Sequence, residues 1–182
     1  MLLPLAVALT AALAALGPKA IPAILDGVVP QDAPGAAADA EEKRLRGQLE
    51  RTHDAASCRA LAAFYGTSRR ADALSTLEAC SAAAPRDQEL LMAVATTAWD
   101  WAYRDPTLRG PAQGAVVERG LHAVDSALAL SPEHFEALIY KVLLLRVKAT
   151  LQQDAGQRQK LVEEAALLQK KALEIKKRQN AP

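Results

Sequence analysis

The phrase Ala-Leu-Ala-Leu-Ser-Pro at residues 127–132 is typical of the end of one helix, a stop, and the approach to another helix. Related phrases occur on either side of it. Their comparable positions are 47 and 45 residues apart: Cys80, Ala127 and Ala172. A unit that recurs at such a distance predicts an array of helical hairpins, in which each unit packs mainly on its neighbours.

The composition indicates the same fold class. Apolar residues make up 51% of the chain but aromatic residues only 4%, so the apolar content is mostly Ala and Leu. These two residues have high helix propensity, and we therefore expect an all-α domain. The formal net charge is +1, which gives no argument for nucleic acid as a partner. Basic residues crowd the end of the chain; we interpret them as solvating its last helix, with binding to an anionic surface as the alternative.

The first 27 residues are dominated by an apolar run. Residues 2–16 are uncharged and apolar, which is shorter than the ~20 residues of a membrane span and typical of a secretory signal. Ala12-Leu13-Ala14 fits a cleavage pattern, but no Lys or Arg precedes the run, and apolar residues resume at Ile21. We therefore predict that residues 1–27 are a signal peptide or a retained N-terminal anchor helix; a buried helix of a cytosolic domain is the remaining alternative.

The rest of the chain divides into a linker and a repeat domain. Residues 28–40 are rich in Ala with interspersed Pro and Gly, which predicts a flexible linker. Residues 41–182 are predicted to form the repeat domain. Apolar residues at helical spacing predict its helices: one or two pieces within 41–65, then 71–83, 89–103, 115–130, 135–153 and 157–177.

The apolar residues of these helices resemble the tetratricopeptide (TPR) repeat pattern, with large and small residues in a first helix, small residues in a second, and a following Pro. The middle unit carries the pattern in the set Leu91, Val94, Ala95, Ala98, Gly120, Val124, Ala127 and Pro132. The first unit carries it in Cys58, Leu61, Ala62, Tyr65, Ala73, Leu77, Cys80 and Pro85. The third carries it in Leu138, Val142, Leu145, Ala165, Leu168 and Ala172. The second and third units exceed the ~34 residues of the family, and the extra residues are predicted between the paired helices, at 105–114 and 150–159.

The resemblance implies a right-handed α-solenoid of about three antiparallel helix pairs, which follows the apolar N-terminal segment. It also implies a non-enzymatic scaffold that binds a protein or peptide on its concave face. The first helix of each pair would line that face, with these candidate residues: Glu89, Met92, Thr96, Trp99, Asp100, Glu136, Ile139, Leu143 and Arg146. Trp99 would be an aromatic anchor for the partner. The alternative is that Trp99 or Trp101 fills space under the loop that follows.

The two cysteines lie in the predicted helices on either side of a turn near Ser68. If the chain is exported, a disulfide between Cys58 and Cys80 is expected; otherwise two buried thiols are the simpler interpretation. His53, His122 and His134 are scattered without metal-ligand spacing. The sequence contains no HExxH, GxSxG, GxGxxG or P-loop motif. We therefore predict no catalytic residues, no metal and no cofactor.

These observations favour an exported, bacterial periplasmic or membrane-associated scaffold over a cytoplasmic protein. The alternative function is a structural subunit of a membrane-associated complex, tethered by an uncleaved N-terminal segment. In both cases the expected partner is a protein or peptide, and the N-terminal segment is the expected means of membrane association.

Overall fold

The computed structural model describes residues 34–180, which form seven α-helices and no strand. The helices are α1 (Pro34–Thr52), α2 (Ala55–Tyr65), α3 (Arg70–Ala83), α4 (Gln88–Arg104), α5 (Gly110–Leu130), α6 (Phe135–Leu151) and α7 (Ala155–Gln179). The all-α prediction is thus confirmed for this part of the chain. The predicted N-terminal segment at 1–27 lies outside the described residues, as does the linker up to residue 33. No described helix is long and apolar enough to cross a membrane.

Polar caps define where several helices begin. The carboxylates of Asp54, Asp87 and Asp154 each accept a hydrogen bond from a backbone N–H in the first turn of α2, α4 and α7. His134 does the same for α6 through Nδ1, 3.1 Å from the Ala137 nitrogen. Each cap satisfies a donor that the helix leaves without a partner, typically worth about 1 kcal/mol.

Three helices begin two or more residues before the predicted start. α1 begins at Pro34, so residues 34–40 of the predicted linker are helical. α5 begins at Gly110, with Pro111 in its first turn, and α7 begins at Ala155. Proline is favoured in the first turn because the missing N–H has no helical partner there. Most of the extra residues in the second and third units therefore lengthen the helices, and the loops between them are shorter than predicted.

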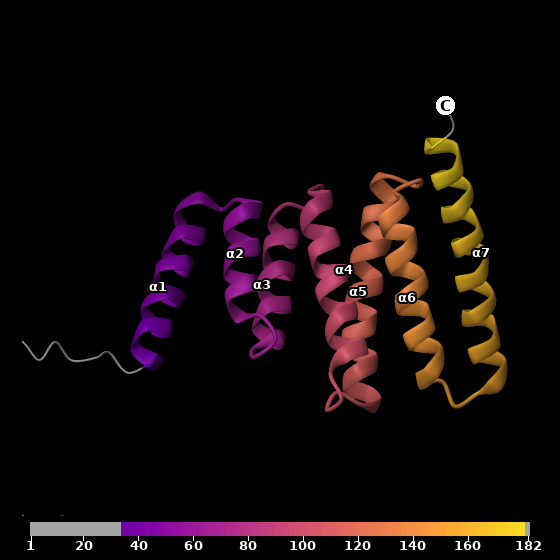
Figure 1. The fold of residues 1–182 in the computed structure, drawn as a ribbon, viewed down its shortest axis with the longest axis horizontal. Helices are drawn as coiled ribbons and strands as arrows, with labels where there is room; N and C mark the ends of the chain where they lie inside the picture. Colours follow the sequence, from indigo (N-terminus) through magenta and orange to yellow (C-terminus); the bar gives the residue numbers. More distant parts are fainter. Residues whose placement is uncertain (1–33, 181–182) are drawn as a thin grey trace, which may run out of the picture. The chain divides into compact units, whose positions relative to one another are not determined.

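Successive helices run antiparallel, and each packs on the next one along the chain (Figure 1). In addition, α2 contacts α4, and α4 contacts α6. Among the described helices α1 packs on α2 alone, and α7 on α6 alone. The first helices of the three predicted pairs therefore meet one another directly.

Small residues lie where the helices cross. Ala95, Ala98, Ala102 and Ala127 are fully buried, and Gly120 of α5 is buried between α4 and α6. Small side chains let helix backbones approach closely, while Leu and Val fill the spaces between crossings. The core is continuous from Leu45 of α1 to Ala165 of α7.

Candidate functional site

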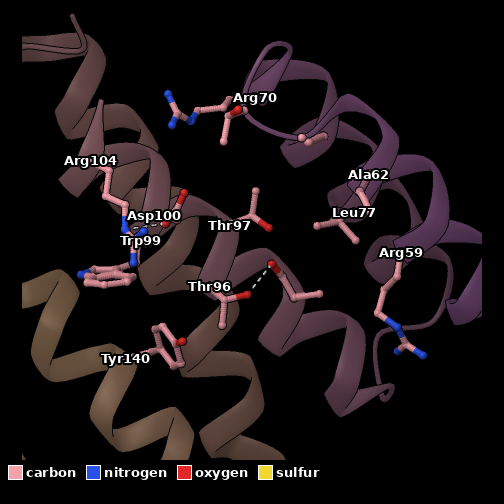
Figure 2. Close-up of a pocket in the computed structure, with 15 residues that line it drawn as sticks. Arg59, Ala62, Arg70, Leu77, Thr96, Thr97, Trp99, Asp100, Arg104 and Tyr140 are labelled. Atoms are coloured by element: carbon pink, nitrogen blue, oxygen red, sulfur yellow. Dashed lines mark hydrogen bonds and ion pairs between the residues drawn. The ribbon is translucent and has the colours of Figure 1, made fainter. Parts of the chain in front are cut away.

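The candidate site is a groove with a volume of about 480 Å³ between α2 and α4, which we call the α2–α4 groove. It is lined by side chains of α2, α3, α4 and α6, and by the turn that joins α2 to α3: Arg59, Ala62, Ala63, Gly66, Thr67, Arg70, Ala73, Leu77, Ala93, Thr96, Thr97, Trp99, Asp100, Arg104 and Tyr140. In Figure 2, Trp99, Asp100 and Arg104 lie on one side, and Ala62, Leu77 and Arg59 on the other. The α2–α3 side is apolar at Ala62, Ala63, Ala73 and Leu77, and it also carries Arg59 and Arg70.

Three aromatic rings form a cluster at the α4 side of the groove. Trp99 stacks on Tyr103, with ring centroids 5.3 Å apart and planes 11° apart. The rings of Trp99 and Tyr140 of α6 form an edge-to-face pair, with centroids 5.9 Å apart and planes 73° apart. Tyr103 is 66% exposed, whereas Trp99 is half-buried. The cluster therefore offers a rigid aromatic surface that is only partly covered, the kind of surface that anchors a partner side chain.

Each of the three arginines in the groove has a carboxylate partner. Arg59 of α2 bonds Glu89 of α4, with Nη1 and Oε2 2.6 Å apart. Arg104 bonds Asp100 on the same helix, with Nε and Oδ1 2.9 Å apart. These pairs are exposed, so their contribution to stability is small. They leave the groove without a strong excess of positive charge.

The third pair is better shielded and fixes one end of the groove. Arg70 Nη1 lies 3.0 Å from Asp105 Oδ2, and both side chains are largely buried. The hydroxyl and backbone N–H of Thr107 donate to Asp105 and, together with Arg70, lower the pKa of that carboxyl from 3.8 to about 2. The pair connects the start of α3 to the residue that ends α4. It therefore holds the two walls of the groove at a fixed separation.

The structure places only part of the predicted concave set in the groove. Thr96, Trp99 and Asp100 line it, and Glu89 reaches it through the ion pair with Arg59. Met92 is buried in the core instead.

The α6 candidates do not line the groove. Arg146 donates to Gln169 of α7, with Nη2 and Oε1 2.6 Å apart. Ile139 packs against the small core cluster formed by Leu138, Ala172 and Ile175. Glu136 and Leu143 are absent from the lining as well. From α6, Tyr140 is the residue that reaches the groove, one position beyond the predicted Ile139.

Sequence reasoning missed the three arginines and Tyr140. The ion pairs join residues far apart in the sequence, Arg59 with Glu89 and Arg70 with Asp105, with separations of 30 and 35 residues, and no motif in the sequence indicates them.

Cys58 and Cys80 are joined as a disulfide in the structure, with Cα atoms 6.4 Å apart, a spacing ordinary for such bonds. The bond connects α2 to α3. Both cysteines line a second pocket of about 620 Å³ beside α1, separate from the α2–α4 groove. The bond therefore holds together the two helices that form one wall of the groove without occupying it.

The described residues hold no cluster of three or more His, Cys, Asp and Glu side chains arranged to bind a metal ion. Comparisons with protein-family models, curated proteins and solved structures find no match for this chain. The chemistry of the groove is therefore the basis for a functional proposal.

Proposed function

We propose that this chain is a non-enzymatic scaffold of the tetratricopeptide type, exported from the cytoplasm, which binds a peptide segment of a partner protein in the α2–α4 groove. Helices α2 to α7 would form three antiparallel pairs of a right-handed solenoid. The direct contacts from α2 to α4 and from α4 to α6 support this arrangement, because they line up the first helices on one side.

The observation that carries the proposal is the joint lining of one groove by four helices. Its surface combines alanines, the hydroxyl groups of Thr96 and Thr97, and a half-buried Trp99. Such a surface suits an extended segment that places an aromatic or aliphatic side chain against Trp99 and Tyr140. Because the arginines are already paired, we expect apolar contact to dominate binding.

Selection from a displayed random-peptide library tests this proposal on the full chain. We expect enriched peptides to share an aromatic or large aliphatic residue. Their affinity should fall about 10-fold or more for Trp99→Ala, because this substitution removes a buried anchor. Arg146→Ala is the matched control: Arg146 is exposed on α6 and bonded to α7, so this variant should bind like the wild type.

Two outcomes would contradict the groove as the binding site. One is a library that yields no enriched motif. The other is a set of enriched peptides that bind Trp99→Ala and Arg146→Ala equally well. Because apolar contacts should dominate, the dissociation constant should also change by less than about 3-fold across the physiological range of ionic strength.

Export is a separate part of the proposal and rests on the apolar run at residues 2–16. N-terminal sequencing of the protein isolated from its native cell distinguishes the two candidate functions. A start near Ala15 supports a processed, exported scaffold. An intact Met1 supports the alternative, a structural subunit tethered in a membrane-associated complex by the uncleaved segment.

A further inference from the structure

One face of α5 is covered by α6, and its burial and charges can be compared with those of the equivalent face of α7. Two ion pairs connect these helices: Glu118 with Lys148, and Asp125 with Lys141, each 2.7 Å between nitrogen and oxygen. The apolar residues on the same side of α5 are buried: Val117, Leu121 and Val124. This side of α5 is therefore an apolar strip flanked by acidic residues, and α6 supplies the basic partners.

α7 repeats α5 at an offset of 45 residues. Gly120 and Ala127 of α5 correspond to Ala165 and Ala172 of α7, and all four are buried against the preceding helix layer. With the same offset, Val117, Leu121 and Leu128 correspond to three residues that we call the α7 stripe: Val162, Ala166 and Leu173. Val124 corresponds to the polar Gln169, which accepts a hydrogen bond from Arg146 of α6.

The α7 stripe is exposed. Val162 is 45% exposed, whereas its α5 counterpart Val117 is fully buried; Leu173 is 57% exposed, and its counterpart Leu128 is partly buried. Leu167, which lies beyond the row of Glu163 and Lys170 on the same helix, is 71% exposed. Among the described helices α7 contacts α6 alone. The helix face that α6 covers on α5 is thus exposed on α7, where it still carries apolar residues.

The charges that flank the α7 stripe indicate what covers it. The counterparts of Glu118 and Asp125 are Glu163 and Lys170, so two acids become one acid and one base. They lie seven residues apart, about 10 Å along the helix. When two copies of α7 pair antiparallel, Glu163 of each copy lies opposite Lys170 of the other. Such a face is complementary to itself rather than to a basic helix such as α6.

α1, the first described helix, does not offer an apolar surface to which the α7 stripe of another copy could bind. Large apolar residues with high exposure occur on α4, α5 and α7 within residues 34–180, and none of them is on α1. α1 is instead rich in charged side chains. A head-to-tail contact of α7 with α1 of another copy would bury those charges against the α7 stripe. A closed two-fold contact avoids this cost.

We propose that the α7 stripe binds a second copy of this chain, with the two α7 helices antiparallel around a two-fold axis at the level of Ala166. Val162 of each copy then packs near Leu173 of the other, and two Glu163–Lys170 pairs flank the contact. A single helix pair buries less surface than a typical stable dimer interface. The dimer is therefore concentration-dependent. It leaves the α2–α4 groove free in each copy.

Sedimentation equilibrium of the full chain, over concentrations from about 5 to 500 µM, tests the proposal. We expect a reversible monomer–dimer equilibrium. Leu173→Glu should weaken it about 10-fold or more because the charge enters the apolar contact. Lys170→Glu should also weaken it, because it places two acids opposite two acids. The double variant Glu163→Lys/Lys170→Glu should restore the dissociation constant of the wild type.

Lys160→Glu is the matched control, since it makes the same charge change at an exposed position of α7 away from the stripe. It should dimerise like the wild type, and far-UV circular dichroism should show every variant fully helical. A chain that stays monomeric throughout would overturn the proposal. So would a dimer that Leu173→Glu does not weaken, which would place self-association elsewhere, such as in residues 1–33. Loss of dimerisation leaves peptide binding in the groove unchanged, so the two proposals fail independently.

Discussion

At the residue scale, Gly120 lies at a close crossing of α4, α5 and α6. A Cβ atom added there would lie 2.9 Å from Cβ of Ala98 on α4, and 3.0 Å from the two Cδ atoms of Leu144 on α6. Overpacking of this kind costs about 1–3 kcal/mol, while replacing Gly by Ala inside a helix gains up to about 1 kcal/mol. We expect Gly120→Ala to lower the free energy of unfolding by about 1–2 kcal/mol, measured by urea denaturation.

Gly114 is the matched control because it lies in the same helix with room around it. A Cβ at Gly114 would meet Leu151 at 3.9 Å, an ordinary van der Waals contact. Gly114→Ala should therefore stabilise the protein by up to about 1 kcal/mol through helix propensity. Equal effects of the two substitutions would contradict the close crossing of α4, α5 and α6.

At the element scale, the Cys58–Cys80 bond cross-links α2 and α3 over a sequence separation of 22 residues. Closing a loop of this size restricts the unfolded chain and is worth about 3 kcal/mol. We expect a reductant to lower the free energy of unfolding of the oxidised protein by roughly that amount. The Cys58→Ala/Cys80→Ala variant should be insensitive to the reductant. Labelling of two free thiols in the denatured, non-reduced protein isolated from its native cell would contradict the bond.

The helices themselves were largely predictable from the sequence, and the exceptions have physical reasons. α3 and α6 begin within one residue of the predicted start because a turn or a cap precedes a clear apolar pattern. The start of α5 was placed at residue 115 rather than 110 because Gly110-Pro111 resembles a loop. In the structure Pro111 is a first-turn residue, where its missing N–H costs nothing. Gly156 likewise follows the cap Asp154 instead of interrupting a helix.

The site was less predictable than the helices. Trp99 was predictable because aromatic residues are rare in this chain and Trp99 lies on the predicted first helix of a pair. The predicted α6 residues do not line the α2–α4 groove, and their orientation was hard to predict because α6 is apolar on most of its circumference, with buried residues from Ala137 to Ala149. A helix of that kind has no single apolar stripe to fix its rotation. Only the contact with α7 shows that Arg146 lies outside the groove.

At the scale of the whole molecule, one network connects α1 to the helices that form the groove. Glu42 of α1 accepts hydrogen bonds from Arg46, from Arg69 ahead of α3, and from the hydroxyl of the buried Tyr65 of α2. Arg69 also lies over the Tyr65 ring, 4.3 Å from its centroid. Among the described helices α1 packs on α2 alone, and this network is one of its two polar attachments. The other is formed by Gln48 and Thr52, which both hydrogen-bond Ser57 of α2.

This network makes the free energy of unfolding depend on pH in the acidic range. The hydrogen bonds from Arg69, then Arg46, lower the pKa of Glu42 from its ordinary value of 4.5 to about 2. The unfolded chain therefore takes up a proton at Glu42 before the folded chain does, so this contribution is fully present above pH 4.5 and disappears as the pH falls towards 2. In urea denaturation between pH 6 and pH 2, Glu42→Gln should flatten the decline seen below pH 4.5. Glu50→Gln, at an exposed position of α1, should keep the profile of the wild type. If Glu42→Gln declines as steeply as the wild type, the network does not attach α1 through an ionised Glu42.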